Sequence, residues 1–174
     1  ENEKIYAIIS NDLLNAYISF REEEFESSIL GIQVFKIINI FKNNINIDEF
    51  ISFINETTNK ISNNKKTIFS LRSTPLSNDD SIIYKKIGFN HVESLITLEL
   101  KLKKLKSISL NNIEIATRVD AVDCGEIAFK SFKHDRFHKD TLIQNDKASL
   151  IKREWAINAC KGRSDNVFIF KKNK

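Results

Sequence analysis

Along the first part of the chain, segments with the hydrophobic pattern of a strand alternate with segments whose apolar residues have the spacing of a helix. Residues 33–41, QVFKIINIF, are rich in β-branched and aromatic side chains and predict a strand. Residues 47–61, IDEFISFINETTNKI, place apolar side chains at helical spacing after Asn46, a residue suited to cap a helix. A strand at 67–73 and a helix at 79–88, which ends on a glycine, repeat this order.

A longer alternating stretch follows the second helix. Residues 89–104, FNHVESLITLELKLKK, alternate over much of their length and predict a strand that completes a βαβαβ order. Charged and turn-forming residues at 106–112 then interrupt the pattern. We therefore expect a domain boundary in that stretch.

The remainder of the chain predicts a strand, two helices and a final strand. The strands are expected at 113–118 and 166–171, and the helices at 121–132 and 146–162. Asp120 directly precedes the first of these helices and can cap it. Alternating strands and helices favour an α/β fold in which helices cover a mostly parallel or mixed sheet.

Composition adds limits on class and compartment. A chain of 174 residues that is 41% hydrophobic and 29% charged can form one moderate domain or two small ones. No apolar run reaches the roughly 18 residues of a membrane span, and the first residues, ENEKIYAIIS, lack the features of a secretory signal. We expect a cytoplasmic protein that does not enter a membrane. Cys124 and Cys160 are then expected to be free, buried thiols without a catalytic role.

The charge balance argues against a nucleic-acid partner. The formal net charge is +4, but 27 basic residues are nearly matched by 23 acidic ones. The densest basic run, KLKKLK at 101–106, carries no exposed aromatic pattern and belongs to no recognised motif. A solvated strand end or linker is the favoured interpretation of this run.

Four segments carry a family resemblance. They are FESSILGIQVFKI (25–37), YKKIGFNHVES (84–94), AFKSFKHDRFHKD (128–140) and REWAINACKGRSDNVFIF (153–170). In this order and at these separations, they resemble N-acetyltransferases of the GNAT superfamily, and among them the dTDP-fucosamine acetyltransferases. The resemblance runs from about residue 25 to the last residues printed. It implies an N-terminal α/β subdomain over 1–108 and the first part of a GNAT core over 109–174.

The resemblance also implies an activity. Such bacterial enzymes move an acetyl group from acetyl-CoA to the amino group of a nucleotide-linked 4-amino-4,6-dideoxy sugar, for a surface polysaccharide, and they are often homodimers. One feature departs from the family: the Gly-rich loop that holds the CoA pyrophosphate does not occur in this sequence. We therefore expect these residues to be an N-terminal portion that alone binds CoA poorly and transfers no acetyl group. A non-catalytic α/β module that binds a sugar nucleotide or a partner is the alternative.

The resemblance places Glu93 at the substrate cleft, where a carboxylate could accept the proton of the sugar amine. Judged from the residues alone, a surface-facing position on an alternating strand is the favoured interpretation of Glu93, and its candidacy depends on the resemblance. His91, two positions away, would share its face of that strand and could pair with it, or be an exposed edge residue. Glu93 is the candidate catalytic base.

The candidate substrate contacts come from the third and fourth segments. The resemblance suggests that Arg136, His138 and Asp140 line a loop beside the acceptor pocket, and that Arg136 could pair with a phosphate of the nucleotide sugar. A loop held by its own Arg–Asp ion pair is the alternative. Asn158 could orient a sugar hydroxyl or bond to a neighbouring loop, and Trp155 favours a packing role.

Two further features favour structural roles. His134 and His138 are four residues apart, but no third ligand accompanies them, so we expect no metal. Tyr84 lies in a segment that resembles the part of a GNAT core carrying the general acid, yet no phosphate loop precedes it. We expect Tyr84 to pack at a helix surface.

Overall fold

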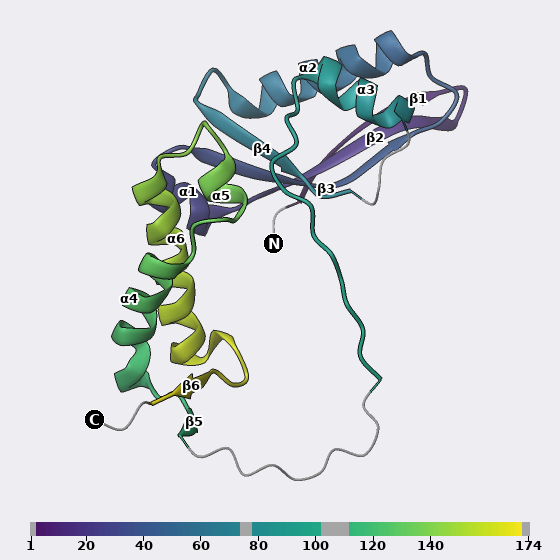
Figure 1. The fold of residues 1–174 in the computed structure, drawn as a ribbon. Coiled ribbons are helices and arrows are strands. Elements are labelled where there is room, and N and C mark those ends of the chain that lie inside the picture. The colour runs from purple at the N-terminus through teal and green to yellow at the C-terminus, as the bar shows by residue number, and fades with distance from the viewer. Residues whose placement is uncertain (1–2, 74–77, 102–111, 172–174) are drawn as a thin grey trace. The chain divides into compact units, whose positions relative to one another are not determined.

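The computed structural model describes residues 3–73, 78–101 and 112–171, and the chain divides into two compact units, Glu1–His91 and Val92–Lys174. The elements of both units are labelled in Figure 1. The boundary predicted at 106–112, and with it the division at 108/109, lies almost entirely outside the described residues and stays a prediction.

The first unit is built on a four-stranded mixed sheet with the strand order β1-β2-β3-β4. Its strands are β1 (Glu3–Ser10), β2 (Leu13–Glu22), β3 (Gln33–Lys42) and β4 (Thr67–Leu71). Neighbouring strands are antiparallel from β1 to β3, whereas β4 runs parallel to β3. The helices are α1 (Glu24–Leu30), α2 (Ile47–Ser62) and α3 (Asn78–Ile87). The predicted α/β class with a mixed sheet is confirmed.

Local chain signals explain how these elements begin and end. Asn11 and Asp12 join β1 to β2 with φ angles of 52° and 60°, the left-handed conformation that a tight hairpin requires. The Asn46 side chain accepts a hydrogen bond of 2.8 Å from the Asp48 N–H and so caps α2, as predicted. Gly88 follows α3 with a φ of 103°, which a residue without a Cβ adopts freely.

The core of the first unit lies between α2, α3 and one face of the sheet. Phe50, Ile54 and Ile61 from α2 are buried there together with Ile83 from α3. The sheet contributes buried side chains from its two central strands: Ala16, Ile18, Phe20, Phe35 and Ile37. Figure 1 shows both helices on this side of the sheet.

The strand predicted at 89–104 is wrong for its described part. Residues 89–101 contain no regular secondary structure, so the element order of the first unit is ββαβαβα rather than βαβαβ. Alternation makes a stretch suitable for a sheet, but a strand forms only when its backbone pairs with another strand, and residues 89–101 do not pair with any of the described strands. The apolar side chains of this stretch remain exposed: Leu95, Ile96, Leu98 and Leu100.

The second unit contains a helical pair and a two-stranded ribbon. Its elements are β5 (Ile113–Ile115), η1 (Arg118–Asp120), α4 (Ala121–Ser131), α5 (Arg136–Lys139), α6 (Asn145–Asn158), η2 (Ala159–Arg163) and β6 (Phe168–Phe170). β5 and β6 pair antiparallel, and α4 packs beside α6. The predicted order of strand, helix, helix and strand is confirmed. The ribbon leaves the apolar side chains of one face exposed: Ile113, Ile115, Phe168 and Phe170.

The predicted role of Asp120 is corrected. Asp120 makes no side-chain cap to α4. Instead, its Oδ2 accepts hydrogen bonds from the backbone N–H of Thr117 at 2.8 Å and from the Thr117 hydroxyl at 2.7 Å, forming the capping box of η1. The 3-10 turn that precedes α4 needs this cap, because its first N–H groups have no partner within the turn.

Among the described residues, no helix combines the length and the apolar character that a bilayer crossing demands.

Candidate functional site

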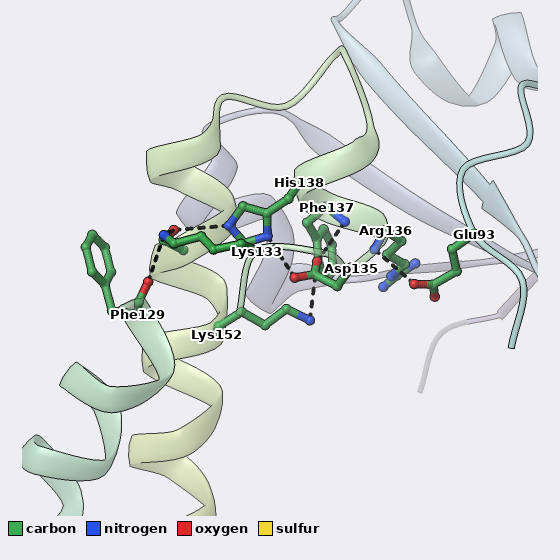
Figure 2. Close-up of polar contacts among 9 residues, drawn as sticks. Glu93, Phe129, Lys133, Asp135, Arg136, Phe137, His138 and Lys152 are labelled. Atoms are coloured by element: carbon green, nitrogen blue, oxygen red, sulfur yellow. Dashed lines mark hydrogen bonds and ion pairs between the residues drawn. The ribbon is translucent and has the colours of Figure 1, made fainter. Parts of the chain in front are cut away.

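Two carboxylates occupy the start of α5, a helix of a single turn in the second unit. Asp135 precedes the helix, and its Oδ1 accepts a hydrogen bond of 2.9 Å from the Phe137 N–H. Glu93 Oε2 accepts one of 2.9 Å from the Arg136 N–H, as Figure 2 shows. The first N–H groups of a helix have no partner within it, so the two carboxylates satisfy donors that the turn itself leaves open.

The imidazole of His138 joins α5 to α6. Its Nδ1 lies 2.7 Å from Asp135 Oδ2, and its Nε2 lies 3.1 Å from Ser149 Oγ on α6. Because an ionised carboxylate can only accept, Nδ1 must carry a proton that it donates to Asp135. In a neutral imidazole Nε2 then accepts, and the hydroxyl of Ser149 donates to it. The His138 side chain is only 4% exposed, so both bonds are shielded from water.

Two lysines complete this cluster. Lys133 Nζ donates to Ser149 Oγ at 2.9 Å and to the Phe129 carbonyl at 3.1 Å. Lys152 Nζ lies 3.4 Å from Asp135 Oδ1. We call the five side chains of Lys133, Asp135, His138, Ser149 and Lys152 the α5 polar cluster. Figure 2 labels Lys133, Asp135, His138 and Lys152.

The environment of Asp135 keeps it ionised. Burial raises the pKa of its carboxyl, but the hydrogen bonds from His138 and from the Phe137 N–H, together with the charge of Lys152, outweigh burial and hold the pKa below its ordinary value. The negative charge of Asp135 therefore offsets part of the positive charge that Lys152 brings into a largely buried position.

Ser149, His138 and Asp135 follow one another in the order of a hydrolase triad, with separations of 3.1 and 2.7 Å. A nucleophile must reach its substrate, yet Ser149 is only 2% exposed and lies within a helix. Its oxygen already accepts a hydrogen bond from Lys133, which lowers its nucleophilic character. The α5 polar cluster is therefore a clamp between α5 and α6, and not a site of acyl transfer through serine.

The structure brings two of the predicted site residues together. Glu93 and Arg136 are 43 positions apart in the chain and meet at the start of α5. The guanidinium of Arg136 lies 4.3 Å from the centre of the Phe137 ring. Glu93 and Arg136 are both partly exposed, whereas Phe137 is buried and anchors α5.

The other predicted residues have different positions. The His138 ring points inward to Asp135 and Ser149, so contact with a substrate would require it to leave both partners. Asp140 ends α5, and its Oδ1 accepts a hydrogen bond of 2.9 Å from the Leu142 N–H. Asn158 is the last residue of α6 and lies about 13 Å along the helix axis from Ser149. The roles predicted for them stay predictions.

The prediction that Glu93 and His91 share one face of a strand is wrong. Both residues belong to a stretch without a strand, so no alternating face brings them together. Glu93 is positioned by its hydrogen bond to α5 instead. Its assignment as the catalytic base stays a prediction.

Four members of the α5 polar cluster were missed in the sequence: Lys133, Asp135, Ser149 and Lys152. A signal for two of them exists, since Ser149 and Lys152 directly follow Ala148 and Ile151 and are buried on α6 together with these two apolar residues. Polar residues on an apolar helix face usually have a buried partner. Sequence alone does not say which residue that partner is.

The aromatic residues take packing roles. Trp155 meets Phe137 edge to face, with ring centres 5.6 Å apart. Tyr84 packs edge to face against Phe89 at 6.0 Å in the first unit, and burial, followed by the charge of Asp80, raises the pKa of its phenol. Both contacts agree with the packing roles that the sequence favours.

Cys124 and Cys160 are free thiols, Cys160 buried and Cys124 partly so. Burial, and then the hydrogen bond with Cys160, raise the pKa of Cys124 to about 11. At neutral pH this thiol is protonated and therefore a poor nucleophile. As to metals, the described part of the chain contains no group of three or more metal-ligating His, Cys, Asp or Glu side chains.

Comparison with known proteins leaves the family open. No protein-family model matches the chain, and no curated protein matches it. Among solved structures, the crystal structure of "a probable acetyltransferase" superposes with a TM-score of 0.42 at 12% identity, covering 59% of this chain and 70% of that one. A likeness at this level carries no argument about function.

Proposed function

We propose that this chain provides the acceptor side of a GNAT-type N-acetyltransferase. In this proposal the acetyl donor is acetyl-CoA, and the acceptor is the amino group of a nucleotide-linked amino-dideoxy sugar. One observation supports the proposal in addition to the resemblance. Glu93, the candidate base, and Arg136, the candidate phosphate ligand, come from separate segments of the sequence. They are in contact at the start of α5, where the Arg136 N–H donates a hydrogen bond of 2.9 Å to the Glu93 carboxylate.

Glu93 is suited to the role of base. A carboxylate offers about four acceptor positions, so the bond to the Arg136 N–H leaves capacity for a proton from the sugar ammonium, taken directly or through a water. The same bond fixes the direction of the carboxylate, which a base requires. The freed amine would attack the thioester carbonyl, and the carbon–sulfur bond would break to release the CoA thiolate.

Arg136 is suited to hold the acceptor. Its guanidinium rests on the buried Phe137 ring and can present two parallel N–H groups to a diphosphate oxygen pair. The α5 polar cluster would hold the short helix, and thus Arg136, in position through His138. Asp140 and Asn158 are candidates for sugar hydroxyls.

The acyl-CoA side is not assigned to any residue of this chain. The sequence contains no Gly-rich pyrophosphate loop. The exposed apolar face of the β5–β6 ribbon has the character that further strands of an acetyltransferase core would cover.

A second candidate function is a non-catalytic module that binds a sugar nucleotide. The position of Glu93 favours it, because the Glu93 carboxylate already serves as a cap of α5. This module and the acetyltransferase share the acceptor site and differ in whether acetyl transfer follows.

Titration of the ¹⁵N-labelled chain with a dTDP-linked 4-amino-4,6-dideoxy sugar tests the acceptor site. We expect amide shifts at Arg136 and Phe137, and a dissociation constant raised by about tenfold in Arg136→Ala because a charged phosphate contact is lost. Lys139→Ala removes an exposed cation from the same helix and should leave binding unchanged. A chain that gives no shifts at α5 would contradict both candidate functions.

Acetyl transfer separates the two candidates. The amide of Glu93→Gln can still accept the hydrogen bond from the Arg136 N–H but takes no proton. In a protein that includes an acyl-CoA site, we expect this variant to bind the sugar nucleotide normally and to lose turnover by about a hundredfold. Normal binding by the wild type without any acetyl transfer from acetyl-CoA would support the non-catalytic module.

A further inference from the structure

The outer edge of β1 is open in the first unit. β1 lies at the end of the sheet order, and within the described residues no strand pairs with its outer side. It is eight residues long and contains no proline. A free edge of this length presents a row of backbone N–H and C=O groups to another strand.

The side chains of β1 divide into a core face and an exposed face. Tyr6 and Ile8 pack against the core, whereas Ile5, Ala7 and Ile9 alternate with them and are exposed. Ile5 is 66% exposed and Ile9 is 67% exposed. The register irregularity beside Ile8 skips a residue of β2, so β1 itself keeps its alternation.

Natural sheets protect such an edge with charges, prolines or a covering segment. In β1 the charges are confined to the first two residues, Glu3 and Lys4, and the remaining residues from Ile5 to Ser10 carry none. The edge is therefore apolar over most of its length and is suited to a partner strand of the same character.

We propose that β1 pairs antiparallel with β1 of a second copy of this chain, with the two-fold axis at Ala7, which joins two four-stranded sheets into one continuous sheet. This register places Ile5 of each copy opposite Ile9 of the other, so both exposed isoleucines gain a cross-strand partner. Side chains opposite each other must share a face, which the register satisfies because all three residues lie on the exposed face.

The neighbouring register, centred on Tyr6, is less favourable. It would place Ile5 opposite Ala7 and Ile9 opposite the charged Glu3. The Ala7 register avoids this mismatch at both ends of the strand. Since one strand per copy forms the contact, the dimer should be weak and concentration-dependent, with a dissociation constant in the micromolar range.

Sedimentation velocity over about 5 to 500 micromolar protein tests the pairing. We expect a monomer–dimer equilibrium for the wild type, and a dissociation constant at least about tenfold higher for Ile5→Lys/Ile9→Lys, which sets like charges opposite each other. Ile82→Lys is the matched control, because Ile82 is 56% exposed on α3 of the same unit. Circular dichroism should show the same fold for all three proteins.

A charge-reversal variant tests the register. In the Ala7 register, Ile5→Lys/Ile9→Glu places opposite charges across the axis twice and should restore the dimer that the double-lysine variant loses. Ala7→Cys should form an intermolecular disulfide, since the two Cβ atoms face each other at the axis. A wild type that stays monomeric over the whole range, or a charge-reversal variant no more dimeric than the double-lysine variant, would overturn the proposal.

Discussion

The polar residues around α5 depend on one another for their ionisation and their direction. Asp135 receives hydrogen bonds from His138 and from the Phe137 N–H, and its lowered pKa keeps it available to Lys152 as a counter-charge. Ser149 connects Lys133 to the imidazole of His138. Removing Ser149 or Asp135 therefore leaves one ring nitrogen of the buried His138 without its hydrogen-bond partner, which costs more than the lost bond itself.

Ser149→Ala tests the clamp. We expect the free energy of unfolding to fall by about 1 to 3 kcal/mol, since Lys133 and His138 lose a shared buried partner. Chemical denaturation measures this. Ser131→Ala, an exposed serine at the end of α4, is the matched control and should change stability little. Labelling of Ser149 by a fluorophosphonate would contradict its assignment as a structural residue.

Asp120 gives a prediction for acid pH. The backbone N–H of Thr117, and then its hydroxyl and Lys171, lower the pKa of Asp120 to about 2. An aspartate in an unfolded chain has a pKa of about 4. Asp120 therefore contributes stability that is fully present above that pH and is lost as the pH falls through about 2. An NMR titration should place its midpoint near 2 in the folded protein, and Thr117→Val should raise it. A midpoint near that of the free residue would contradict the capping box.

At the scale of elements, helices were better predicted than strands. The helices α2, α3, α4 and α6 all lie where the helical spacing of apolar residues places them, because the pattern and the hydrogen bonds of a helix are both local. β1 was missed and the strand at 89–104 was wrongly expected, since a strand needs a partner that its own residues do not specify. α5 was not predicted, because a helix of one turn has too few residues to show the helical spacing of apolar positions.

Gly125 lies where α4 and α6 approach closely. A Cβ at this position would lie 2.7 Å from Ile157 Cγ1 and 3.3 Å from Arg153 Cγ. Alanine favours a helix over glycine by about 1 kcal/mol, but overpacking costs about 1 to 3 kcal/mol, so we expect Gly125→Ala to destabilise the protein by up to about 2 kcal/mol.

A double-mutant cycle separates the two effects of Gly125→Ala. In an Ile157→Ala background both contacting carbons of Ile157 are gone, and the substitution at position 125 should then be neutral or stabilising. Thermal or urea unfolding of the four proteins measures the coupling. Equal effects of Gly125→Ala in both backgrounds would show that contact with Ile157 is not what makes the substitution destabilising.

At the scale of the whole molecule, the chain contains two units with separate cores. One core lies between the mixed sheet and its helices, and a smaller one joins Ala121, Ile157 and Cys160. All of the predicted site residues belong to the second unit, Glu93 included, because that unit begins at Val92. The proposed acceptor site and the proposed β1 contact are therefore on different units and can fail independently.

The charge of the whole molecule gives a prediction about nucleic acid. With 27 basic and 23 acidic residues, the chain lacks the excess charge that tracks a phosphate backbone. Fluorescence anisotropy with a DNA duplex and a single-stranded RNA should detect no binding at about 150 millimolar salt. Replacing the four lysines of KLKKLK by alanine should then make no difference. Tight binding lost in that variant would identify the run as a nucleic-acid patch.

By itself the sequence determined the α/β class, most helices and the cap of α2, because periodicity and capping act over a few neighbouring residues. It also pointed to Glu93 and Arg136 through a resemblance. Only the tertiary structure decided that these two residues meet, that His138 turns inward to Ser149, and that β1 ends the sheet with no described strand on its outer side. Each of these depends on groups far apart in the chain, and the packing of whole elements selects which of them come into contact.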